Sequence, residues 1–156
     1  MGKFKSIEKL LRPDPRYKNR TVGKFINCLM YDGQKVKAQT IFYDALKAVE
    51  KKVPGVDPLE IFTKALDNVK PLIEVRSRRV GGATYQVPVE VGVKRQMSLA
   101  FRWMIQATRK KKGRPMYLRL SDEIAAAYKK EGEAITMREN VHKMAEANKA
   151  FAHFAW

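Results

Sequence analysis

Residues 74–91 read EVRSRRVGGATYQVPVEV, and this stretch of eighteen residues decides the fold of the chain. Apolar and polar residues alternate on both sides of Gly81 and Gly82, which is the period of a β-strand. Two glycines between such runs are typical of a hairpin turn. The apolar members of the alternation are Ile73, Val75, Tyr85, Val87, Val89 and Val91, and the polar members are Glu74, Arg76, Thr84, Gln86 and Glu90. The sequence therefore predicts one projecting β-ribbon over about residues 72–91.

On both sides of the ribbon, apolar residues recur at the i, i+3, i+4, i+7 spacing of one helix face. The expected N-terminal signals are Thr21 for the first helix, Asp57 with Pro58 for the third, and Thr136 with Glu139 for the sixth. The six predicted helices cover about residues 21–33, 35–52, 57–69, 93–108, 115–132 and 136–152. The fourth and sixth helices are expected to bury, respectively, Met97, Ala100, Phe101, Met104, Ile105 and Thr108, and Val141, Met144, Ala145, Asn148 and Ala152. The predicted fold class is mainly α, a single domain of about six helices over residues 1–156 with one β-hairpin between the third and fourth helices.

The charge of the chain is large and unevenly distributed. The 156 residues include 32 Lys and Arg against 16 Asp and Glu, so the formal net charge is +16. Residues 1–20, a basic N-terminal tail, carry +5, residues 70–114 carry +10, and the other segments are almost balanced. A field of one sign attracts polyanions and destabilises the compact state by self-repulsion, so this asymmetry favours nucleic acid or an anionic membrane as the partner.

Motifs for catalysis, metal binding and cofactor binding are absent from the sequence. Cys28 is the only cysteine, and with His142 and His153 it cannot form a structural zinc site. We expect Cys28 to be a half-buried thiol on the flank of the first helix, without a catalytic base. No nucleotide-binding or hydrolase motif occurs, and neither a membrane span nor a secretory signal is found. We therefore predict no catalytic residue, no metal and no cofactor, in a reducing, intracellular setting.

The basic residues of the fourth predicted helix form a face of their own. Arg95, Arg102, Gln106 and Arg109 lie opposite the apolar stripe, since a seven-residue spacing repeats one face of a helix. An ordinary solvated face mixes both signs of charge, but residues 91–121 contain no acidic residue. This face therefore predicts contact with nucleic acid.

The ribbon is the second basic element, because Arg76, Arg78 and Arg79 lie close to its glycine turn. Guanidinium groups fork onto phosphates and stack on bases, so an arginine-rich finger favours RNA over a lipid surface. A two-stranded ribbon has little apolar area of its own, so we expect its tip to be mobile in the free protein.

The sixth predicted helix carries a weaker basic flank. Its members are Arg138, His142, Lys149 and His153, with Glu146 nearby. A neutral surface and a nucleic-acid edge fit this flank equally well.

Residues 74–91 closely resemble the signature of bacterial small-subunit ribosomal protein seven. Three further blocks are similar to the same family in the same order, namely residues 68–71 (NVKP), 99–103 (LAFRW) and 144–154 (MAEANKAFAHF). The resemblance implies six helices with a β-ribbon, and a protein that binds the 3′ major domain of small-subunit rRNA directly and nucleates assembly of the subunit head. It further implies a place at the subunit interface near the exit-site tRNA and the mRNA exit path, beside small-subunit proteins nine and eleven. The expected location is the small ribosomal subunit of the cytoplasm, with an organellar ribosome left open and no membrane partner.

The resemblance also assigns site residues, since Arg76, Arg78 and Arg79 match the family's ribbon and Arg95 and Arg102 match its basic helix. With the other basic groups, the predicted rRNA-binding set is Lys3, Lys5, Arg12, Lys35, Arg76, Arg78, Arg79, Lys94, Arg95, Arg102, Arg109, Lys110, Lys111 and Arg114. The residues expected near tRNA are Arg78, Arg79, Gly81, Gly82 and Tyr85.

The chain departs from the family's pattern at both ends, where Lys3-Phe4-Lys5 replaces an arginine-rich start and Ala155 replaces the usual Arg before the final Trp. Two rival function classes are a helical DNA-binding module and a small RNA-processing enzyme. The first would place a recognition helix in a helix-turn-helix, and the second would need convergent acids or a pair of histidines. The sequence indicates neither.

Overall fold

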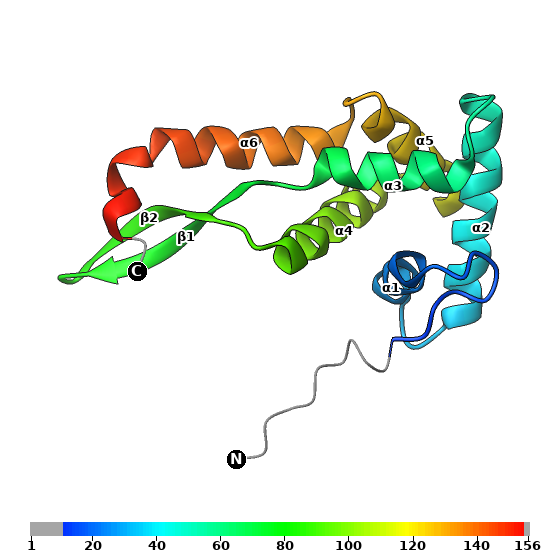
Figure 1. The fold of residues 1–156 in the computed structure, drawn as a ribbon, viewed down its shortest axis with the longest axis horizontal. Coiled ribbons are helices and arrows are strands. Elements are labelled where there is room, and N and C mark those ends of the chain that lie inside the picture. Colours follow the sequence, from blue (N-terminus) through cyan, green and yellow to red (C-terminus); the bar gives the residue numbers. More distant parts are fainter. Residues whose placement is uncertain (1–10, 155–156) are drawn as a thin grey trace, which may run out of the picture. The chain divides into compact units, whose positions relative to one another are not determined.

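A computed structural model describes residues 11–154 (Figure 1). The chain divides into two compact units, Met1–Tyr43 and Asp44–Trp156, each with its own packing. The elements are α1 (Arg20–Leu29), α2 (Lys35–Lys52), α3 (Pro58–Val69), β1 (Ile73–Val80), β2 (Ala83–Glu90), α4 (Val93–Lys110), α5 (Met116–Tyr128), α6 (Glu133–Ala147) and the 3-10 helix η2 (Lys149–Phe154). The predicted fold class is confirmed, because the structure is mainly helical with one antiparallel hairpin between α3 and α4. The organisation as a single domain stays a prediction.

Helix α1 begins at Arg20, two residues earlier than an N-cap at Thr21 predicts. The side chain of Asn19 caps it, because Oδ1 accepts the backbone N–H of Thr21 at 2.7 Å. Asn19 has an extended backbone, with φ of −108°, as an N-cap residue requires. The prediction that Thr21 is the N-cap is therefore wrong, since Asn19 already occupies that position.

The segment before α1 is fixed by a buried carboxylate. Asp14 accepts the backbone N–H groups of Arg16 and Tyr17, both at 3.0 Å, and the hydroxyl of Tyr43 at 2.8 Å. Burial, together with the hydrogen bond to Asp14, raises the pKa of Tyr43 to about 12. Gly23 allows the same segment to cross α1, because a Cβ atom there would lie 2.8 Å from the carbonyl oxygen of Arg12. Residues 12–17 are thus tied to α1 and α2.

Four helices form the core of the second unit. Helix α3 packs against α4, α5 and α6, and α4 also contacts α5 and α6. The largest fully buried apolar side chains of these helices are Ile61, Phe62, Leu66, Phe101, Met104, Leu120 and Ile124. The inner face predicted for α4 is confirmed from Ala100 to Thr108, and Met97 lies at its half-buried edge.

Helix α6 differs from its prediction at both ends. It begins at Glu133 with Gly132 as N-cap, so the predicted capping box at Thr136 is wrong. The capping acceptor comes from another helix, because the buried carboxylate of Glu123 in α5 accepts the N–H of Ala134 at 2.9 Å. Gly132 has a φ of +97°, which disfavours any residue with a Cβ atom, and that atom would also lie 2.9 Å from Glu123 Oε1.

The inner face predicted for α6 is confirmed at Ala145 and wrong at Met144 and Ala152, which are exposed. Met144 is 50% exposed, and the buried residues of the helix are Ala134, Ile135 and Ala145. The helical turn beyond Ala147 changes to the 3-10 helix η2, so the face predicted to continue to Ala152 is not continuous.

The ribbon has the predicted turn at Gly81 and Gly82. Val80 pairs with Ala83, and Gly81 and Gly82 have φ angles of +57° and +88° between them. These two positive angles explain the requirement for glycine, because residues with a Cβ atom rarely adopt a positive φ. Burial in β1 does not follow the alternation of apolar and polar residues, because Glu74 is buried and Ile73 is 37% exposed.

Neighbouring elements hold the ribbon along one side. Figure 1 shows α6 running beside it and η2 lying against β2. The ring of Tyr85 lies 5.2 Å from the rings of both Phe151 and Phe154, measured between centroids. At the base of the ribbon, the N–H of Leu72 donates to Nε2 of His142 at 3.1 Å.

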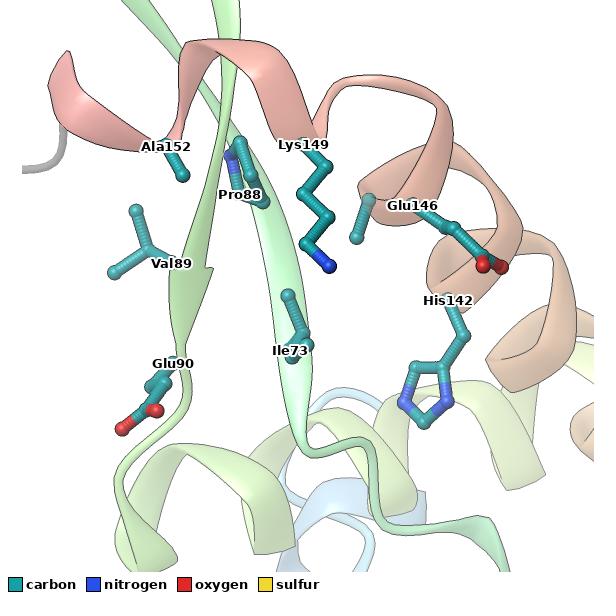
Figure 2. A pocket seen from close by; sticks show the side chains of 9 residues that line it. Ile73, Pro88, Val89, Glu90, His142, Glu146, Lys149 and Ala152 are labelled. Atoms are coloured by element: carbon teal, nitrogen blue, oxygen red, sulfur yellow. The ribbon is translucent and has the colours of Figure 1, made fainter.

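An open groove of about 430 Å³ remains between the ribbon and the C-terminal helices. Figure 2 shows Ile73 and Pro88 of the ribbon facing this groove together with His142 and Lys149. The contacts of Leu72 and Tyr85 attach the ribbon at its base and along β2, and they leave this groove open.

We predict that Phe151→Ala increases the mobility of the ribbon. Loss of an aromatic pair removes about 0.5–1.5 kcal/mol beyond its buried area, and Tyr85 would keep one ring partner. Hydrogen exchange at residues 76–86 should accelerate, whereas exchange in α4 should not change. Met144→Ala is the matched control, because it removes a large apolar side chain that is already exposed. Unchanged exchange in the ribbon would contradict its attachment by η2.

We also predict a stability loss on mild acidification that depends on His142. Burial, and then the positive charge of Arg138, hold the pKa of His142 below its ordinary value of 6.5. The stability contribution of the neutral ring is therefore complete above about pH 6.5 and is lost as the pH falls, because the unfolded chain takes up the proton more readily. The hydrogen bond to Leu72 contributes about 0.5 kcal/mol, or about 1–2 °C in Tm, since water reaches the pair.

The measurement is Tm at about pH 7.5 and about pH 5.5 for the natural chain and for His142→Gln, whose side chain can accept the same N–H without titrating. On acidification, Tm should fall further in the natural chain than in His142→Gln. Equal losses would show that this hydrogen bond does not matter to stability.

Candidate nucleic-acid interface

Helix α4 separates an apolar face from a basic one. Leu99, Ala100 and Phe101 are buried, whereas Arg95, Arg102 and Gln106 are exposed. Arg102 makes no side-chain hydrogen bond or ion pair within residues 11–154. Its guanidinium group is therefore available to a partner, as the helical spacing predicted.

Two predicted site residues from different elements meet at one carboxylate. Arg76 of β1 donates from Nε to Oε1 of Glu74 at 2.6 Å, and its Nη2 also contacts that oxygen. Arg95 of α4 donates from Nε to Oε2 of Glu74 at 3.2 Å. The side chain of Glu74 is 10% exposed, and those of Arg76 and Arg95 are 51% and 45% exposed. Each arginine therefore presents its outer edge to solvent while Glu74 holds its inner edge.

The electrostatics of this cluster favour an ionised carboxylate. Burial alone would raise the pKa of Glu74, but the hydrogen bonds from Arg76 and Arg95 and their charges outweigh it and lower the pKa below 4.5. The cluster consequently carries one net positive charge at neutral pH.

The basic loop that follows α4 is more strongly paired than its sequence indicated. Lys110 contacts Glu133 at 2.5 Å, Lys111 contacts Glu123 at 2.7 Å, and Arg114 contacts Asp122 at 2.9 Å. The hydrogen bond from Lys110 also lowers the pKa of Glu133. The three cations were predicted to bind rRNA, and each already has an acidic partner from α5 or α6.

Other groups fix or extend this loop. Arg119 of α5 donates to the carbonyl oxygens of Thr108 and Lys111. Lys112, which lies outside the predicted set, is exposed and has no side-chain partner within residues 11–154. The charge run around it signalled Lys112 as clearly as its neighbours.

The turn end of the ribbon combines basic and glycine residues. Arg79, Gly81 and Gly82 are exposed, and Arg78 pairs across the ribbon with Tyr85. Tyr85 is half-buried against η2, so only part of its ring is open to a partner. The proximity of these five residues to tRNA stays a prediction.

The remaining predicted residues lie elsewhere. Arg12 and Lys35 are exposed in the unit Met1–Tyr43, and Lys94 is exposed in the first turn of α4. Arg109 is half-buried near the end of α4. Lys3 and Lys5 lie outside the described residues.

The flank of α6 has structural uses that its sequence left open. Arg138 donates to the carbonyl oxygen of Asn68 at the end of α3, and His142 accepts the N–H of Leu72. Lys149 lines the groove beside the ribbon (Figure 2). These contacts favour packing over nucleic-acid binding for Arg138 and His142.

Residues 11–154 lack the features of two other function classes, metal sites and membrane spans. There, no group of three or more His, Cys, Asp and Glu residues is arranged to hold a metal ion. None of the helices in this range has the length and apolarity needed to cross a bilayer. Cys28 is exposed, so the prediction of a half-buried thiol is wrong.

Comparison with known proteins agrees with the basic, helical architecture. Residues 2–149 match the family described as Ribosomal protein S7p/S5e. The "Small ribosomal subunit protein uS7" of Rhodopirellula baltica is 58% identical over 157 residues, covering 100% of both chains. The protein of the same name from Pseudothermotoga lettingae is 55% identical with 94% of each chain covered. That from Brachyspira hyodysenteriae is 57% identical, covering 92% of this chain and 91% of its own. With such identity along its length, and the ribbon motif between α3 and α4, the chain belongs to the Ribosomal protein S7p/S5e family.

Proposed function

We propose that this protein is a structural component of the small ribosomal subunit that binds the 3′ major domain of its rRNA and nucleates assembly of the head. The observation that carries the proposal is the two-sided character of α4. One face is buried in the core, and the other presents Arg95 and Arg102 from a stretch, residues 91–121, without a single acid. The names of the relatives as small-subunit proteins support the same assignment.

The finer position follows from the resemblance of the ribbon to the family. We place the protein at the subunit interface, near the exit-site tRNA and the mRNA exit path and beside small-subunit proteins nine and eleven. The exposed tip with Arg79, Gly81 and Gly82 suits such a position, since a glycine turn allows close approach of an RNA backbone. The location is then the small ribosomal subunit of the cytoplasm, and no catalytic role is proposed.

The chemistry of binding follows from the charge distribution. Lys and Arg side chains that neutralise phosphates release condensed counterions, which supplies sequence-independent affinity. A-form RNA hides its base edges in a deep, narrow groove, so shape and phosphate contacts dominate recognition of its duplex regions. A rigid helix face carrying arginines at fixed spacing can match the positions of phosphates on a folded RNA.

A helical DNA-binding module remains the main rival from another class. Its recognition helix would enter the major groove of duplex DNA. In this chain the element that projects is a ribbon, and the basic face of α4 is flanked by that ribbon. The two functions are separated by comparing the head-domain rRNA fragment with duplex DNA of equal charge.

That comparison tests the proposal directly. The dissociation constants of the full chain for the two nucleic acids are measured at one salt concentration near physiological ionic strength. We expect tighter binding to the rRNA fragment. Equal affinities, or a preference for the DNA, would overturn the proposed function.

We predict a strong dependence of rRNA affinity on salt. Two basic segments with +15 between them must release many counterions on meeting phosphate, so log K should fall by several units per tenfold increase in salt. A titration over a salt series gives this slope. A slope shallower than about −2 would mean that few phosphates are neutralised.

We predict that Arg102→Ala weakens rRNA binding without unfolding the chain. The side chain is exposed on α4, so Tm should change little, and the loss of one phosphate contact should reduce the salt slope by about one unit. The matched control is Lys51→Ala, which removes one charge from an exposed position on α2. A lower Tm with unchanged rRNA affinity would mean that Arg102 acts in folding.

A further inference from the structure

We propose that Glu74 is a positioning residue for RNA recognition, which holds Arg76 of the ribbon and Arg95 of α4 as one rigid unit and thereby gives the protein discrimination between its RNA and other polyanions. The proposal rests on the proposed function, since it concerns how that interface recognises RNA. It assigns a recognition role to an acidic side chain in the most basic part of the chain.

The geometry of the carboxylate is that of a bridge. Its two oxygens are used separately, Oε1 by Arg76 and Oε2 by Arg95. The two arginines lie on different elements, β1 and α4, and are nineteen residues apart in the sequence. Glu74 itself is buried, so the bridge lies beneath the surface that a ligand would contact.

The bridge leaves donors available for a ligand. An arginine has five N–H donors in a planar fork. Arg95 gives only Nε to Glu74, so both of its terminal nitrogens can face a phosphate. Arg76 gives Nε and Nη2, and its Nη1 remains. A guanidinium whose inner edge is fixed has lost much of its rotamer freedom before binding, so less entropy is lost when a phosphate is bound.

If only charge mattered, Glu74 would weaken the binding of RNA. Without Glu74 the cluster would carry two positive charges in place of one, and affinity for any polyanion would rise. The arginines would also move independently, so phosphates at many spacings could be accommodated. A carboxylate here therefore lowers general affinity while fixing one spacing, which is the condition for discrimination by phosphate position.

A purely structural role makes a different prediction. If Glu74 only attached the ribbon to α4, its loss would reduce the fraction of folded protein. All nucleic acids would then bind more weakly by the same factor. The ratio of affinities for two RNAs separates the two roles, because unfolding does not change that ratio.

The test uses the full chain and two probes, the head-domain rRNA fragment and an RNA of the same length with a scrambled sequence. Glu74→Gln keeps the size of the side chain and removes its charge. We expect the ratio of affinities to fall about tenfold, the scale of one lost hydrogen bond to a charged group. Affinity for the scrambled RNA should stay the same or increase, and the salt slope should steepen by up to about one unit.

Two further variants make the result specific. Glu50→Gln removes one negative charge at an exposed position on α2 where no ion pair forms within residues 11–154, so it should leave the ratio unchanged. Arg95→Lys keeps the charge and removes the fork, so the ratio should fall while the salt slope stays the same. This second variant remains informative if Glu74→Gln does not fold, which circular dichroism would reveal.

The outcomes distinguish a failure of the role proposed for Glu74 from a failure of the proposed function. If the natural chain binds both RNAs equally, the proposed function fails. If the natural chain discriminates and a folded Glu74→Gln keeps the full ratio, only the role of Glu74 is overturned. If Glu74→Gln does not fold, an unchanged ratio in Arg95→Lys overturns it instead. A fall in Tm with equal losses for both RNAs would likewise assign Glu74 to folding alone.

Discussion

Repulsion among cations is the constraint on which the arrangement of this protein depends. A chain with a net charge of +16 cannot place arginines and lysines side by side without a means of holding them there. Buried carboxylates provide it at two points in the second unit. Glu74 lies beneath Arg76 and Arg95, and Glu123 binds Lys111 while also capping α6. Each acid joins two elements, so the same contacts that reduce repulsion also fix the helices and the ribbon in place.

Local periodicity predicted the elements well, because an apolar stripe or an alternating run depends only on nearby residues. The buried face of α4 and the glycine turn at Gly81 and Gly82 were both predicted in this way. The start of α6 was not, since its capping acceptor, Glu123, belongs to a different helix. The burial of Glu74 was missed for the same reason, because one of its two partners, Arg95, lies on α4. Contacts between elements far apart in the sequence leave no signal in a single periodicity.

In the candidate site, too, features that depend on nearby residues could be predicted and contacts between distant elements could not. Exposure of Arg102 follows from its position on a helical wheel and could be predicted. The pairing of Lys110, Lys111 and Arg114 could not, because a charge count over residues 91–121 finds no acid while the fold brings acids from α5 and α6 to the loop. Counting charge along the chain therefore overestimates how many cations are available to a partner. The exposed Arg102 on the basic face of α4 is a better guide to binding than the densest basic run.

The strands of the ribbon are held by neighbouring elements, whereas its turn remains exposed. Two strands alone are marginally stable in water, so the hairpin depends on its neighbours for order. Those neighbours reach it through Glu74 and Leu72 near the base and through Tyr85 further along β2. None of these three contacts involves the exposed residues 81–84 at the turn. Because the fixed points lie on the strands or directly before β1, the turn can adapt to an RNA surface while Arg76 and Arg95 keep their spacing. A turn packed onto a helix would lose that freedom, and a ribbon attached only at its base would lose the spacing.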